Sequence, residues 1–205
     1  MHSLGHTLLV HSSDSYKGEI PSMKTEMKLA EALKNLMAKE SIDTITVKRL
    51  TAMCGINRQT FYYHFRDIYD LITWIYLNES VENLEKATST SESLLLIFSY
   101  LKRNEAIIKN TLASAGRELV IQFLYNTCYN LALKAVIAID RNPLLTVEER
   151  KFIGNFYAPS YVYMLINWVD SGMKEEPKVL VERALILVES HIVDHVIKIK
   201  NKRGI

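Results

Sequence analysis

The apolar residues of the chain recur at the spacing of an α-helix. In the stretch 25–39, the positions i, i+4, i+7 and i+8 are apolar and share one helix face: Leu29, Leu33, Leu36 and Met37. No run of alternating apolar and polar residues, typical of a half-buried strand, competes with this pattern. Only 7 glycines and 4 prolines interrupt the chain. The sequence therefore predicts an all-α fold of about nine helices.

Two short helices follow the first one. Thr46 can cap a helix over 47–53, Gly55 can adopt the positive φ at which that helix ends, and Asn57 can cap a third helix. Two short helices joined by a turn that contains glycine are typical of a helix-turn-helix. We therefore expect a DNA-binding domain at 23–72 and an effector-binding and dimerisation domain at 73–205.

The first residues of the chain show no periodicity. Residues 1–22 are expected to form a flexible arm, or to lie upstream of a start at Met23. The apolar residues 8–10 are too few for a signal peptide or a membrane span. Cys54 and Cys128 lack Cys-x-x-Cys spacing, which fits buried thiols in a reducing compartment. A cytoplasmic protein without a membrane partner is expected.

The third helix carries several hydrogen-bonding side chains on the end that enters the major groove in a recognition helix. Arg58 can pair with guanine, Gln59 with adenine, and Thr60 can offer its methyl group to thymine. The candidate contacts to a double-stranded DNA operator are Thr46, Lys48, Asn57, Arg58, Gln59, Thr60, Tyr62, Tyr63 and His64. In the competing interpretation, Tyr62 and Tyr63 pack in the interior and the basic residues only face solvent. The formal net charge of +2 does not decide between the two.

The segment 46–65 resembles the DNA-binding signature of TetR/AcrR-type regulators. It contains Thr46-Val47 and then Gly55-Ile56-Asn57-Arg58-Gln59-Thr60-Phe61-Tyr62-Tyr63-His64-Phe65. The resemblance implies that Thr46 touches a phosphate, that residues 58–60 face bases, and that Tyr62 and His64 hold the DNA backbone. Ile68 stands where the family usually has lysine, so one phosphate contact is missing or is replaced by Arg66.

The second domain resembles that of a TetR subgroup which includes activators of dihydroxyacetone-kinase operons. The resemblance rests on Tyr100-Leu101-Lys102-Arg103-Asn104, Phe156-Tyr157, Trp168-Val169-Asp170-Ser171-Gly172-Met173 and Pro177. The fourth helix is expected to begin at Asp67 and to run to about residue 86. Later helices are expected at 91–104, 105–114, 117–140, 147–171 and 178–200.

The last helix is apolar on nearly every side between Val179 and Val188. One surface cannot cover such a helix, so burial on two sides is expected. In the TetR family the last two long helices form a dimer interface, and a homodimer fits a two-fold operator. The candidate interface residues are Tyr163, Leu185, Val188 and Ile192. The alternative is a central helix in the core of a monomer.

An aromatic stripe surrounds Pro159, which should kink its helix. The stripe, at i, i+4, i+7 and i+11, consists of Tyr157, Tyr161, Met164 and Trp168, and the facing helix offers Phe123, Asn126 and Asn130. Apolar walls with a few polar groups are typical of a small-molecule site, so these residues are candidates to bind an effector. Alternatively, the stripe is ordinary core packing, the asparagines face water, and regulation runs through a partner protein.

The hypothesis that the protein is an enzyme rests on His191 and His195, because two histidines at i and i+4 on a helix can chelate zinc. The segment lacks the glutamate and the further ligand of metallohydrolase motifs. No Ser/His/Asp order, glycine-rich phosphate loop or pair of carboxylates stands out. We therefore expect neither an enzyme nor a cofactor or metal, with a metal-dependent hydrolase as the remote alternative.

Overall fold

A computed structural model describes residues 21–140 and 145–203. Within these ranges the chain forms nine α-helices, two short 3₁₀ segments and no strand, which confirms the predicted all-α fold. The helices are α1 (Pro21–Met37), α2 (Val47–Cys54), α3 (Arg58–His64), α4 (Ile68–Asn78), α5 (Thr90–Arg103), α6 (Glu105–Leu112), α7 (Arg117–Ile139), α8 (Val147–Asp170) and α9 (Pro177–Arg203). The expected arm at 1–22 lies, up to residue 20, outside the described residues.

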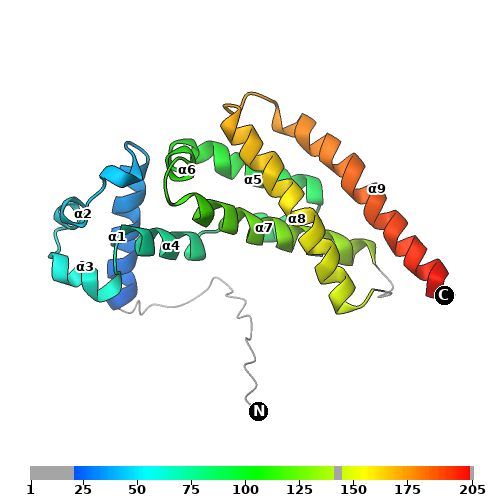
Figure 1. Cartoon of the computed structure of the whole chain (residues 1–205), viewed down its shortest axis with the longest axis horizontal. Helices are drawn as coiled ribbons and strands as arrows, with labels where there is room; N and C mark the ends of the chain where they lie inside the picture. The colour runs from blue at the N-terminus through cyan, green and yellow to red at the C-terminus, as the bar shows by residue number, and fades with distance from the viewer. Residues whose placement is uncertain (1–20, 141–144, 204–205) are drawn as a thin grey trace, which may run out of the picture.

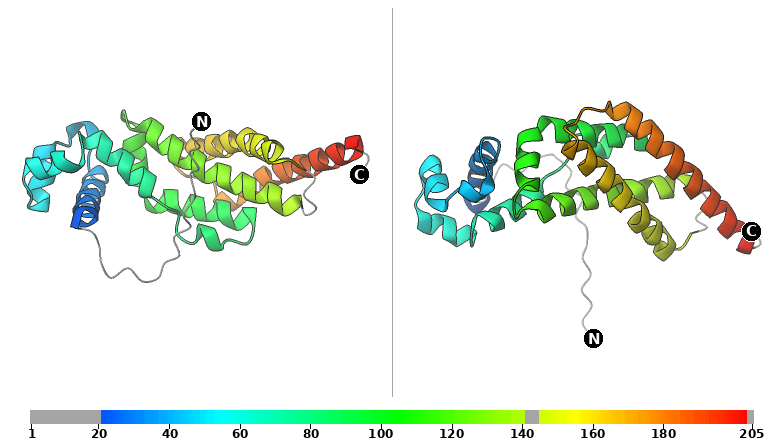
Figure 2. Two further views of the ribbon diagram at one scale, coloured as in Figure 1. Left: turned by 90° about the horizontal axis from the view of Figure 1, so that it is seen from below. Right: turned by 45° about the horizontal axis from the view of Figure 1, so that its top comes forward.

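Helices α1, α2 and α3 form a three-helix unit at one end of the molecule (Figure 1). The predicted apolar face of α1 is buried, with Leu29, Leu33, Leu36 and Met37 each at most 3% exposed. From α3, Phe61 is fully buried. Both views in Figure 2 place this unit at the end opposite the C-terminus of α9.

Side-chain caps fix the ends of the short helices. The Thr46 hydroxyl accepts a hydrogen bond from the Arg49 N–H (3.3 Å), and Asn57 Oδ1 accepts one from the Thr60 N–H (2.7 Å). Gly55 ends α2 in the left-handed region at φ 61°, where a side chain is strained. The caps predicted from the sequence are confirmed, and they set the direction in which α3 leaves the turn.

Helix α4 ends eight residues earlier than the sequence predicted. It stops at Asn78 rather than near residue 86, and the amide of Asn78 bonds back to the carbonyl of Trp74 (2.8 Å). Asn83 adopts a positive φ of 62° before the 3₁₀ segment Leu84–Lys86, and Val81 turns into the core. Burial of Val81 and a turn at Asn83 therefore override the helical pattern.

The remaining helices build a second layer around α7 and α8, which run side by side. A Cβ atom added at Gly154 of α8 would lie 3.0 Å from the ring of Tyr129 on α7, so the two helices approach closely there. Helix α8 continues through Pro159 without interruption, and a capping box of Thr146 and Glu149 stabilises its start. Helix α5 packs on α7 and α9, which completes the core.

Candidate functional site

The N-terminal turn of α3 presents a polar surface. Asn57, Arg58 and Gln59 are exposed, directly beside the buried Phe61 that anchors the helix. Tyr62 and Tyr63 are 57% and 84% exposed. Neither tyrosine packs in the interior, so that competing interpretation of the two rings is wrong.

Two of the polar side chains at the start of α3, Asn57 and Thr60, hydrogen-bond to each other and cap the helix. Asn57 Oδ1 accepts hydrogen bonds from both the backbone N–H and the hydroxyl of Thr60 (2.7 and 3.0 Å). The long side chains of Arg58 and Gln59 therefore occupy the first two helical positions on a fixed first turn. Asn57, Gln59, Thr60 and Tyr63 border a shallow depression of the surface. An exposed guanidinium and amide at a helix N-terminus can hydrogen-bond to the edges of bases.

His64 lies differently from its neighbours. Its side chain is only 7% exposed, and Nδ1 lies 3.3 Å from Oε1 of Glu26 on α1. The ring thus sits between α3 and α1, with little surface left for a DNA backbone. Of the other candidates, Lys48 and Thr46 are exposed at the start of α2.

The position that departs from the TetR pattern is part of the core. Ile68 is 8% exposed, whereas the side chain of Arg66, two residues earlier, is 87% exposed. The backbone N–H of Arg66 donates to Asp70 (3.0 Å), which holds the pKa of that carboxyl below its usual value. Arg66, rather than residue 68, therefore places a positive charge on this part of the surface.

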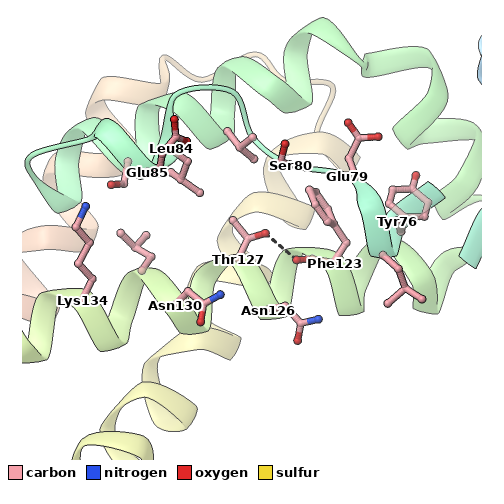
Figure 3. A pocket seen from close by; sticks show the side chains of 14 residues that line it. Tyr76, Glu79, Ser80, Leu84, Glu85, Phe123, Asn126, Thr127, Asn130 and Lys134 are labelled. Carbon is pink, nitrogen blue, oxygen red and sulfur yellow. Dashed lines mark hydrogen bonds between the residues drawn. The ribbon is translucent and has the colours of Figure 1, made fainter. Parts of the chain in front are cut away.

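A cavity of about 600 Å³ lies between α4, residues 79–86, α5 and α7 (Figure 3). Phe123, Asn126 and Asn130, predicted as effector contacts, belong to its lining. Sequence reasoning missed the opposite wall, which includes Tyr76, Glu79, Ser80, Leu84 and Glu85, and also Lys134 on α7. Asn83, a residue type that tolerates left-handed turns, is the sequence signal that could have located this wall.

The aromatic stripe of α8 lies outside the cavity lining. Trp168 is buried, its ring meets Phe98 edge-on at 4.9 Å between centroids, and its Nε1 donates to the Glu175 carbonyl (2.8 Å). Tyr161 is also buried, whereas Tyr157 and Met164 are partly buried against the core. The structure thus separates the seven effector candidates into a cavity group on α7 and a packing group on α8.

Apolar side chains are exposed along α8 and α9. On α8, Phe152, Phe156 and Tyr163 share one stripe and are 67%, 64% and 73% exposed. The exposed apolar residues of α9 are Val179, Ile186, Leu187, Val193 and Ile197. Of the interface candidates, Tyr163 lies on this surface, Leu185 and Val188 turn toward the chain's own core, and the side chain of Ile192 lies outside the described residues. Sequence reasoning missed Phe152 and Phe156.

No group of three His, Cys, Asp or Glu side chains that could hold a metal occurs among the described residues. His191 is exposed on α9, and the side chain of His195 lies outside the described part. None of the described helices combines the length and the apolar character needed to cross a membrane.

A family model described as a transcriptional regulator C-terminal region matches residues 88–190. The HTH-type dhaKLM operon transcriptional activator DhaS of Lactococcus lactis subsp. lactis is 31% identical over 87 residues, which cover 41% of this chain and 46% of that protein. The match thus spans about half the length of this curated relative.

Two solved structures share the fold. The dihydroxyacetone kinase operon activator DhaS superposes with a TM-score of 0.61 at 22% identity, over 82% of this chain and 96% of that one. The fatty acid degradation regulator FadR of Bacillus halodurans gives a TM-score of 0.55 at 16% identity, over 84% and 96% of the two chains. At these identities the likeness extends to the fold alone.

Proposed function

Because the chain belongs to the TetR family of transcriptional regulators, which are not enzymes, we propose that it binds a two-fold symmetric operator as a homodimer. The observation that carries the proposal is the exposed N-terminal turn of α3, fixed by the Asn57 cap and by the buried Phe61. A ligand in the cavity between α4 and α7 then changes the affinity for the operator.

Base reading is assigned to the first turn of α3. Arg58 and Gln59 are long, exposed and held on a capped turn, so they can reach base edges in the major groove. Thr60 uses its hydroxyl within the cap, which leaves its methyl group for contact with a thymine. Lys48, Tyr62, Tyr63 and Arg66 are exposed nearby and suit phosphate contacts, which position the helix without reading sequence.

The exposed apolar surface of α8 and α9 supports the homodimer. Burying Phe152, Phe156 and Tyr163 against the same residues of a second copy gives an isologous interface, as a two-fold operator requires. In this assembly the two α3 helices lie about 34–36 Å apart, one turn of DNA. The likeness to DhaS, an operon activator, supports activation rather than repression as the outcome of binding.

The proposal is tested by the fluorescence anisotropy of labelled DNA from the region upstream of the gene, titrated with the full chain. We expect binding at least about 10³-fold tighter than to random duplex of equal length. Equal affinity for both duplexes would contradict sequence-specific regulation by this protein.

Tyr62→Phe is expected to weaken binding to operator and random DNA alike, by about 0.5–1.5 kcal/mol. The exposed hydroxyl is assigned to a phosphate, which every duplex presents, so the loss does not depend on sequence. Competition titrations with both duplexes measure the two losses. Tyr129→Phe, the same change at a half-buried tyrosine of α7 outside both the α3 surface and the proposed dimer surface, is the matched control and leaves both affinities unchanged. A loss confined to the operator would assign Tyr62 to base reading instead.

A further inference from the structure

One residue of the cavity wall also contacts the three-helix unit. Glu79, directly after α4, lines the cavity and forms an ion pair with Lys34 of α1. The Glu79 side chain is 16% exposed and that of Lys34 is 37% exposed, so the pair is partly shielded from solvent. Glu79 thus links the cavity wall to α1, the first helix of the three-helix unit.

Many hydrogen-bond donors in the cavity wall already have partners within the protein. The pairs are Tyr76 with the Thr111 hydroxyl (3.4 Å), Thr127 with the Phe123 carbonyl (2.8 Å), Ser93 with the Ser89 carbonyl (3.0 Å) and Lys134 with the Ala87 carbonyl (2.6 Å). The Tyr76 hydroxyl is buried, and this burial raises its pKa to about 12. The carboxylates of Glu79 and Glu85 are acceptors that a ligand can use.

Aromatic rings lie at the same end of the cavity as Glu79. Figure 3 shows Tyr76 and Phe123 near Glu79, with Lys134 at the far end. The centroids of the two rings are 5.7 Å apart. A carboxylate beside aromatic rings attracts a cation by charge and by the ring quadrupole, whereas the apolar wall accepts the body of a ligand.

We propose that the cavity binds a small amphiphilic cation, an apolar ring system bearing an ammonium group, and that this group competes with Lys34 for Glu79. The inference rests on the proposed function, because the cavity is the effector site assigned there. When the ligand occupies Glu79, α1 loses its ion pair to the end of α4. Asn110 of α6 still donates to the carbonyls of Met37 and Glu40 (2.6 and 3.3 Å), so the three-helix unit stays attached at α6 and can turn about it.

The competition makes opposite predictions for the two partners of the pair. Glu79→Gln removes the carboxylate and weakens binding of a cation. Lys34→Met removes the competitor and strengthens binding of the same cation. If the ion pair were only structural, both changes would weaken binding, because both would loosen the wall.

Three naphthalene compounds that share the same ring system and differ in charge serve as probes in calorimetric titrations of the full chain at pH 7. They are 1-naphthylmethylamine, a cation, 1-naphthalenemethanol, which is neutral, and 1-naphthoic acid, an anion. We expect the amine to bind about tenfold or more tighter than the acid. In Glu79→Gln the amine falls to the affinity of the alcohol, and in Lys34→Met it binds tighter than in the wild type. Glu82→Gln is the matched control, because Glu82 is exposed, pairs with Arg103 (3.0 Å) and does not line the cavity.

Operator titrations complete the test. The amine is expected to change operator affinity of the wild type by about 5–150-fold, and Lys34→Met without ligand should show the affinity of the amine-bound wild type. Equal binding of the three probes, tighter binding of the acid, no binding of the amine up to about 10 mM, or weaker amine binding in Lys34→Met would each overturn the inference. A wild type that prefers the amine but ignores operator DNA would contradict the proposed function and leave the cation site standing.

Discussion

Phe156→Glu is expected to convert the dimer into a monomer at micromolar concentration and to abolish tight operator binding. Phe156 is 64% exposed and stacks on Phe152, with ring centroids 6.4 Å apart. In a two-fold interface both copies of the chain contribute residue 156. The substitution therefore buries two carboxylates without partners, which costs about 3 kcal/mol or more. Sedimentation velocity measures the loss of the dimer, and anisotropy measures the loss of operator affinity.

The matched control for this change is Ile137→Glu. Ile137 is an apolar residue of α7, 51% exposed and outside the surface of α8 and α9 assigned to the dimer. It should leave both the sedimentation coefficient and the operator affinity as in the wild type. A Phe156→Glu chain that sediments as a dimer would place the interface elsewhere.

Arg58→Ala is expected to cost about 1–3 kcal/mol on the operator and much less on random DNA. Arg58 is exposed on the capped first turn of α3, where a guanidinium can reach two acceptors of a guanine. A comparable loss is expected for Gln59→Ala, with relaxed preference at a different base pair. Because each dimer contributes two such side chains, the loss per dimer exceeds that of one contact.

Competition titrations with operator and random duplexes measure both losses. The control is Arg103→Ala, an exposed arginine of α5 that pairs with Glu82, far from α3 in sequence and outside the three-helix unit. It should change neither affinity. Equal losses of Arg58→Ala on both kinds of DNA would assign Arg58 to phosphate rather than to bases.

The sequence predicted the caps and the exposed first turn of α3 because the signals for them are local. Thr46, Gly55 and Asn57 fix the helix ends through contacts within three or four residues, and Phe61 needs only an apolar environment, which burial in the core supplies. The position of the His64 side chain was harder to predict from the sequence, because its contact is with Glu26, 38 positions away. A spacing pattern within one helix does not report such a partner.

The effector and dimer surfaces depend on long-range packing, and there the sequence was less informative. An aromatic stripe can line a cavity or fill a core, and only the position of Phe98 and the Glu175 carbonyl shows that Trp168 is packed. In α9, apolar on nearly every side, periodicity does not distinguish the face that meets the chain itself from the exposed one. Val188 turns inward, whereas Ile186 lies outward at 72% exposure.

Selection from a randomised duplex library with the full chain tests the central claim most directly. If two α3 helices read DNA as a two-fold dimer, the enriched sequences form an inverted repeat, with half-site centres about 10–10.5 base pairs, or a multiple of this, apart. The same selection with Arg58→Ala should lose its preference at one symmetric pair of positions. Enrichment of no sequence, or of a single unrepeated site, would contradict the account.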